Sequence, residues 1–117
     1  ADFTMSTSYS HYMAECQAPL ETSVRITTPP SPTIGDEYWI VGTTFHNATA
    51  LSASATVSII ANSAGVAQTI NKTTGAIELA TTPTTSSETT ANYRMGHLIC
   101  VAANTWALFV SDYGPTS

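Results

Sequence analysis

The fold is decided by residues 93–110, which read YRMGHLICVAANTWALFV. Two runs rich in aliphatic and aromatic side chains, 93–101 and 106–110, flank four small or polar residues. Those four are Ala102-Ala103-Asn104-Thr105, and asparagine tolerates the left-handed backbone conformation that tight turns use. The stretch therefore predicts two antiparallel strands joined by a hairpin turn.

Shorter segments of the same character precede this hairpin. Apolar and polar side chains alternate weakly over residues 8–15. Further strands are expected where apolar residues alternate with polar ones, or cluster, between turn-forming residues. These strands are expected at residues 23–27, 37–41, 55–61, 68–71 and 76–80. No segment shows the 3.6-residue periodicity of a helix. The sequence therefore predicts an all-β fold, a single small antiparallel β-sandwich or barrel of about eight short strands.

The chain has 117 residues, which is the size of one domain. Residues 1–6 carry no strand pattern. We therefore expect residues 1–15 to form an N-terminal arm or a first strand, and residues 16–117 to form the β-sandwich domain.

The composition excludes two classes of partner. Charged residues make up 9% of the chain and the formal net charge is −5, whereas nucleic-acid binding needs a cationic surface. Arg25, Lys72 and Arg94 are too few and too scattered to form one. No apolar run approaches the roughly 20 residues of a membrane-spanning helix. We expect neither nucleic acid nor membrane as a partner.

The two cysteines, Cys16 and Cys100, lie far apart and outside any Cys-x-x-Cys pattern. Cys100 belongs to the apolar segment Leu98-Ile99-Cys100-Val101, where an unbridged cysteine behaves as a small buried hydrophobe. We expect two unbridged thiols, and a Cys16–Cys100 disulfide is the alternative.

The sequence contains no pattern typical of a catalytic or metal site. Asp36 and Glu37 are adjacent, so on a strand they point to opposite faces and do not share a cleft as glycosidase carboxylates do. His11, His46 and His97 lack the spacing of metal ligands, and no Gly-x-Ser-x-Gly motif is present. We therefore predict a non-enzymatic protein with no catalytic, cofactor-binding or metal-binding residues.

The aromatic residues allow two interpretations. Trp39 and Trp106 each lie within an apolar strand, which favours core anchors. The alternative is a sugar-stacking platform on the protein surface. Its candidate members are Tyr9, Tyr12, Tyr38, Trp39, Tyr93, Trp106 and Tyr113.

Three expected strands carry large apolar side chains on both faces: 37–41, 56–61 and 97–101. A two-layer sandwich has one inner face per sheet, so the remaining apolar groups need another cover. This favours a homo-oligomer. The alternative is a monomer whose Thr-rich loops cover the sheet.

The order of several motifs along the chain carries a resemblance to a known family. They are Val24-Arg25-Ile26-Thr27-Thr28-Pro29, Ile34-Gly35-Asp36-Glu37-Tyr38-Trp39-Ile40-Val41, Val57-Ser58-Ile59-Ile60-Ala61, Gln68-Thr69-Ile70-Asn71, Ala76-Ile77-Glu78-Leu79, 98–108 and Tyr113-Gly114. Over residues 9–114 the chain resembles small all-β modules of bacteriophage virion proteins, above all those of tail fibres. The resemblance implies a homotrimer on the virion surface without enzyme activity.

A tail fibre would show shaft repeats before such a module, and this chain begins directly with Ala1-Asp2. We therefore expect a capsid decoration protein whose residues 1–15 reach over neighbouring capsid subunits. Its partners would be further copies of itself and the capsid or other virion proteins. One alternative is a distal tail-fibre module that binds host-surface carbohydrate. Another is a secreted carbohydrate-binding or adhesin domain.

Overall fold

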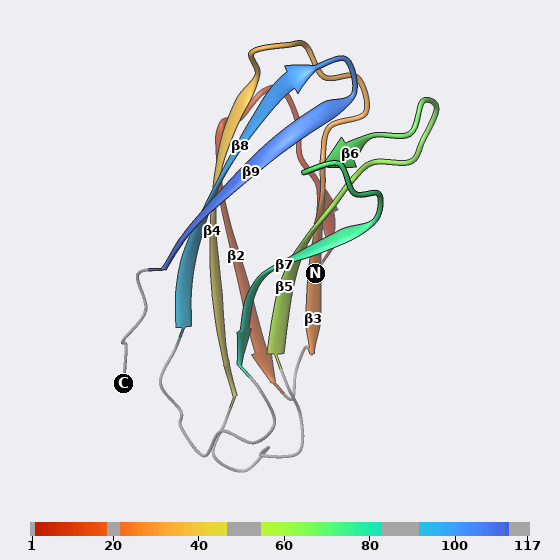
Figure 1. Ribbon diagram of the computed structural model, residues 1–117. Helices are drawn as coiled ribbons and strands as arrows, with labels where there is room; N and C mark the ends of the chain where they lie inside the picture. The colour runs from red at the N-terminus through yellow and green to blue at the C-terminus, as the bar shows by residue number, and fades with distance from the viewer. Residues whose placement is uncertain (1, 19–21, 47–54, 83–91, 113–117) are drawn as a thin grey trace.

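The computed structural model describes residues 2–18, 22–46, 55–82 and 92–112, which form two β-sheets packed face to face (Figure 1). These residues contain nine strands and no helix. The strands are β1 (Phe3–Thr4), β2 (His11–Ala18), β3 (Ser23–Thr27), β4 (Glu37–His46), β5 (Ala55–Ile60), β6 (Thr69–Ile70), β7 (Ala76–Thr82), β8 (Asn92–Ala102) and β9 (Thr105–Asp112).

The first five strands alternate between the two layers. Sheet A has the strand order β1-β3-β5-β7, and sheet B has the order β2-β4-β8-β9-β6. Each crossing to the opposite layer and back brings the chain beside its earlier strand in the same direction, so β1, β3 and β5 are parallel, as are β2 and β4. The pairs β5–β7, β4–β8 and β8–β9 are antiparallel, and β6 pairs with β9 in parallel.

The all-β sandwich predicted from the sequence is confirmed, but the antiparallel arrangement is wrong because both sheets are mixed. The described residues contain nine strands, against the eight or so that the sequence predicts. Alternation of apolar residues reports which face a strand buries, and it carries no information about the direction of the neighbouring strand. The two-residue strand β1 is too short to leave a periodic signal.

Strand β4 continues past Gly42, where the sequence suggests that it ends. Gly42 faces the opposite sheet, and a Cβ atom there would lie 2.9 Å from Leu79 Cδ2. At Gly96, the corresponding Cβ would lie 3.2 Å from Leu79 Cδ1. Both glycines thus leave room for one leucine between the sheets, in the middle of strands rather than at turns.

The core lies between the sheets and consists mainly of the inward-facing aliphatic residues of both layers. Its largest fully buried side chains include Ile26, Ile40, Ile59, Leu79, Leu98 and Trp106. Trp106 is 1% exposed, and its Nε1–H donates to Gln68 Oε1 at 2.7 Å. Gln68 Oε1 also accepts from Thr28 Oγ1 at 2.6 Å, and Gln68 Nε2 donates to Pro29 O at 2.7 Å. These bonds satisfy a buried amide and join β9 of sheet B to the segment that follows β3 of sheet A.

The hairpin predicted at the end of the chain is confirmed. Ala102 pairs with Thr105, and Asn104 has a φ of 53°, in the left-handed region. A second tight turn has left-handed Asn71 and Lys72 at its centre. The Asn71 side chain also pairs with the backbone of Leu108: its Oδ1 accepts at 2.9 Å and its Nδ2 donates at 3.2 Å.

The first described residues belong to the sandwich. Strand β1 pairs with β3, Met5 is 1% exposed, and Asp2 Oδ1 accepts a hydrogen bond from Arg25 N at 2.9 Å. Strand β2 lies at the edge of sheet B, so a boundary between residues 15 and 16 would cut it in two. Residues 2–15 therefore pack within their own domain instead of reaching away from it.

Both cysteines are buried and form no disulfide, as the sequence predicts. Cys16 lies opposite Thr44 near the end of β4. The Cys100 N–H donates to Asp36 O, just before the start of β4. Thr44 and Asp36 are separated by roughly 27 Å of extended chain, and a disulfide needs Cα atoms within about 7 Å.

Candidate functional site

The outer side of sheet B carries rows of apolar and aromatic side chains in register. One row crosses four strands through His11, Trp39, His97 and Phe109. The flanking rows add Met13, Val41 and Met95 on one side and Ile99 on the other. We call these eight residues the sheet B outer patch. They are His11, Met13, Trp39, Val41, Met95, His97, Ile99 and Phe109.

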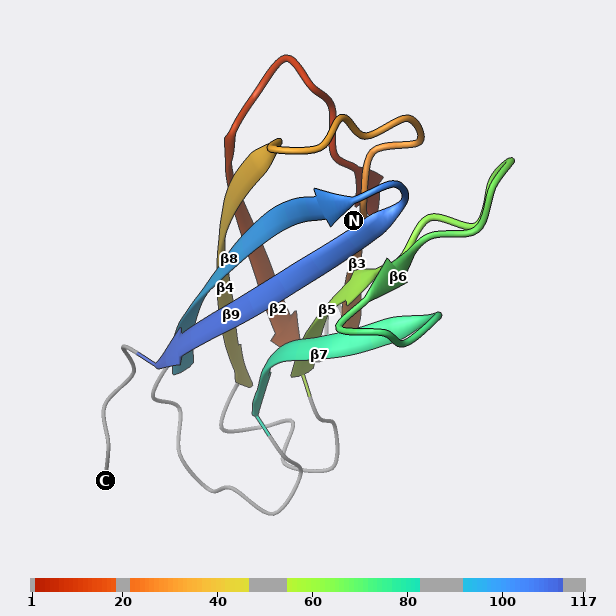
Figure 2. The same ribbon diagram turned by 45° about the horizontal axis from the view of Figure 1, so that its top comes forward.

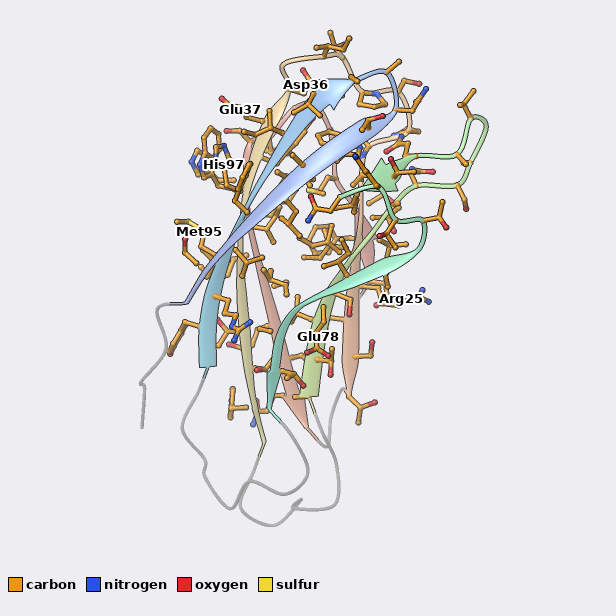
Figure 3. All side chains as sticks on the ribbon, in the orientation of Figure 1. Arg25, Asp36, Glu37, Glu78, Met95 and His97 are labelled. Atoms are coloured by element: carbon orange, nitrogen blue, oxygen red, sulfur yellow. The ribbon has the colours of Figure 1, made fainter. Side chains whose placement is uncertain are left out.

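The patch has no cover within the described residues. Met13 is 76% exposed and Phe109 is 60% exposed, at opposite margins of the patch on β2 and β9. Figure 3 shows Met95 and His97 pointing away from sheet A on the outer side of β8. Two of the strands expected to be apolar on both faces, 37–41 and 97–101, therefore carry their surplus on this one surface. The third does not, since β5 turns Thr56 and Ser58 outward and only Ile60 is apolar there.

Three rings at the centre of the patch are stacked. The His11 and Trp39 ring centroids lie 5.1 Å apart at an interplanar angle of 13°, and those of Trp39 and His97 lie 4.8 Å apart at 12°. Both faces of the indole are thereby covered. Trp106 is a core anchor as predicted, but Trp39 lies outside the core, half-buried by its neighbours on the outer face. A sugar ring stacks on a free aromatic face, and Trp39 offers only its edge.

The tyrosines named for such a platform are dispersed. Tyr38 is buried, and the Tyr12 hydroxyl donates to Ser6 O at 2.7 Å on the inner side. Tyr9 and Tyr93 are exposed on separate strands or turns, and Tyr113 lies outside the described residues.

The acidic pair separates as expected. The Asp36 carboxylate accepts a hydrogen bond from Thr33 N at 2.9 Å and so closes the turn before β4. Glu37 Oε1 lies 3.3 Å from His97 Nε2 at the rim of the patch, and Figure 3 shows the two side chains close together. The contact has an ion-pair distance but not the geometry of a hydrogen bond, and Nε2 has no hydrogen-bond partner among the described residues.

His11 and His97 are brought to one face but are held apart by the Trp39 ring between them. The side chain of His46 lies outside the described part of the chain. Over residues 2–18, 22–46, 55–82 and 92–112, no group of three or more His, Cys, Asp or Glu side chains could hold a metal ion.

The outer side of sheet A has the opposite character. Arg25, Ser58 and Glu78 form one row in register across β3, β5 and β7. Thr56 pairs with Thr81 in the next row, and their hydroxyl groups lie 3.2 Å apart. Figure 3 shows Arg25 and Glu78 on the side of the molecule remote from His97. One sheet thus presents polar side chains, and the other presents the patch.

Two shallow grooves flank the proline segment at one end of the sandwich. One, of about 520 Å³, lies between this segment and residues 64–66, which belong to the stretch projecting from both sheets in Figure 2. Its lining residues are Pro30, Ser31, Pro32, Ala64, Gly65, Val66 and Asn104. The other, of about 380 Å³, lies between the same prolines and residues 5–7. Neither groove is lined by a charged side chain.

Among the described residues, the two titratable groups with clearly shifted pKa values lie inside the sandwich. Burial raises the pKa of the Tyr38 hydroxyl, and the nearby Asp36 carboxylate adds to this shift. Burial also raises the pKa of the Cys100 thiol, against a smaller opposing effect of the Thr105 backbone. Both groups stay neutral at pH 7, and a protonated buried thiol is a poor nucleophile.

No family model, curated protein or solved structure matches the chain. Within its described residues, the chain has no helix of the length and apolar character that a membrane span needs.

Proposed function

We propose that this chain is a non-enzymatic structural module of a bacteriophage virion surface, and that it acts by making protein contacts. The observation that carries the contact role is the sheet B outer patch. Soluble monomers seldom expose contiguous apolar surfaces of more than a few hundred Å² unless another molecule covers them. The virion setting is supported by the resemblance of its motif order to that of small all-β virion modules.

The chemistry of the described residues agrees with this role. The Cys100 thiol and the Tyr38 hydroxyl are buried and neutral, and the Asp36 carboxylate closes a turn. Glu37 and His97 lie 3.3 Å apart without the geometry of a hydrogen bond, so they do not form the oriented pair that nucleophilic catalysis uses. These groups serve the fold or the surface.

Within the virion, we place the module on the capsid as a decoration protein. Residues 2–15 belong to the sandwich, so the proposed contact with the shell does not use an N-terminal arm. The contact is made by faces of the sandwich, and the N-terminal strand β2 contributes His11 and Met13 to one of them.

A distal tail-fibre module that binds host glycan is the second candidate, and the grooves beside the proline segment favour it. Ser31 and Asn104 offer a hydroxyl and an amide in one groove, and exposed Tyr9 follows the segment that lines the other. These groups suit hydrogen bonding and stacking with a sugar better than Trp39 does.

Gold-labelled antibodies against the chain, imaged on particles of the phage that encodes it, test these roles. Label over the head supports the decoration role. Label confined to fibre tips, together with retention of the chain on host lipopolysaccharide, supports the receptor-binding role. Unlabelled particles contradict the virion assignment and favour a secreted carbohydrate-binding or adhesin domain, for which a glycan array is the next measurement.

A further inference from the structure

We infer that the sheet B outer patch packs against the same patch on other copies of this chain. This deepens the proposed function, on which it rests, by naming the surface and the partner. The contact would bring the β9 margin of one copy, with Phe109, to the β2 margin of another copy, with Met13.

The comparison between the two sheets supports an occupied surface. The outer positions of sheets A and B have the same relation to the core, yet sheet A fills them with Arg25, Ser58 and Glu78. Sheet B fills the equivalent positions with the patch residues. A solvent-facing antiparallel or mixed sheet normally alternates apolar inward and polar outward side chains. Sheet A follows this rule, and sheet B departs from it on the four strands that carry the patch.

The size of the surface suits a protein partner. The patch crosses four strands spaced by about 4.8 Å and extends over about five residues of β8, from Met95 to Ile99, at 3.3 Å per residue, so it covers roughly 19 Å by 16 Å in projection. Its projection of about 300 Å² is the apolar centre of a contact to which one partner in a standard interface contributes about 800 Å², and the flanking outer positions of sheet B would supply the rest. The patch supplies an apolar centre, and the exposed Glu15 and Glu37 lie beside it as part of a polar rim.

The charge of the surface is compatible with its own copy. None of the eight patch residues is Lys, Arg, Asp or Glu, and the Glu37 carboxylate at the edge of the patch lies 3.3 Å from His97 Nε2. Packing the patch on itself would therefore bring no like charges of the patch residues against each other. A centre this poor in charge resembles homo-oligomer interfaces more than transient ones between different proteins.

The positions of the two most exposed patch residues also favour a second copy. Met13 and Phe109 lie at opposite margins, on β2 and β9. When two copies face each other about an axis parallel to the strands, the β2 margin of each lies over the β9 margin of the other. Three copies around such an axis also bring neighbouring β2 and β9 margins together. Each copy then supplies both halves of a methionine–aromatic contact, a favourable pairing in protein interiors.

The oligomeric state of the full chain and of charged variants tests the inference. Light scattering coupled to size exclusion should give two or three times the chain mass for the wild-type protein. Phe109→Glu and Met13→Glu should each raise the dissociation constant at least tenfold without changing the far-ultraviolet circular dichroism. Val66→Glu is the matched control, because Val66 is also an exposed apolar residue, 70% accessible, and lies off the patch. It should leave the mass unchanged.

A crosslinking experiment identifies the contact directly. Met13→Cys and Phe109→Cys chains, mixed and oxidised, should form a mixed disulfide, whereas Val66→Cys mixed with either should not. Cys16 and Cys100 are buried, so the wild-type chain provides the background. A monomeric wild-type chain at 100 μM, or an oligomer that survives both charged substitutions, overturns the inference. If the chain is a monomer but still labels virions, the proposed function stands and only this inference fails. If the chain is an oligomer through the patch but labels no virion, the inference stands and the virion assignment fails.

Discussion

Replacing Gln68 by alanine should destabilise the fold more than any other single polar substitution in the described core. Gln68 Oε1 accepts from both Trp106 Nε1 and Thr28 Oγ1, and Gln68 Nε2 donates to Pro29 O. All three bonds are buried and connect parts of both sheets. Removing the amide leaves two buried donors without their acceptor, at a cost of roughly 1–3 kcal/mol each. We therefore expect a loss of about 2–6 kcal/mol, against a total stability of about 5–15 kcal/mol for a domain of this size.

Urea denaturation followed by circular dichroism measures this loss. Gln68→Met keeps the side-chain length and removes the hydrogen bonds, so the difference between the alanine and methionine variants reports the cavity alone. Gln17→Ala on β2 makes the same chemical change at a half-buried site and should stay within about 0.5 kcal/mol. A Gln68→Ala variant that loses less than about 1 kcal/mol would refute the reasoning, because three buried hydrogen bonds would then contribute less than one typically does.

Three further predictions concern packing and pH. Gly42→Ala should cost about 1–3 kcal/mol by crowding Leu79, and in a double-mutant cycle with Leu79→Ala the two costs should be less than additive. Met5→Ala should lower the urea midpoint by an amount equivalent to about 2–5 kcal/mol, since Met5 is buried, and deletion of residues 1–8 should unfold the chain further instead of leaving it intact. The raised pKa values of Cys100 and Tyr38 stabilise the fold below their ordinary values of 9.0 and 10.0, and this contribution is lost as pH rises through the raised values. Stability measured from pH 8 to 11 should therefore fall, and Tyr38→Phe should flatten the decline, whereas an unchanged slope would show that Tyr38 does not contribute.

Side-chain patterns predicted most strands and their inner faces but not how the strands pair. In strand 23–27 the apolar residues Val24 and Ile26 alternate with polar ones, and both are fully buried on the inner face. Asn104 marked the hairpin correctly because the left-handed conformation is a local property of that residue. Parallel pairing depends on which layer each connection enters, and the sequence leaves no local record of that choice.

The contact surface was predicted only in part, for a related reason. Two-sided apolar strands at 37–41 and 97–101 indicated surplus apolar area, and these strands pair side by side in sheet B. Trp39 was misassigned to the core because strand 37–41 is apolar on both faces, and such a run does not show which face points inward. His11 and Phe109 join the patch through the register of β2 and β9, which only the folded chain defines.

The patch draws its residues from both ends of the chain, and this links the contact surface to the fold. His11 and Met13 come from the second strand, whereas Phe109 comes from the last, and they share a surface only when β2 joins β4 and β9 joins β8. A chain that has lost its core would therefore lose the patch as well, so a core substitution cannot separate stability from assembly. The exposed margins can separate them, because Met13 and Phe109 contribute little to the core and most to what a second copy would touch. Suppose that Met13→Glu or Phe109→Glu abolishes association while the chain still unfolds at the wild-type urea concentration. That result would assign the surface to contact between copies rather than to folding.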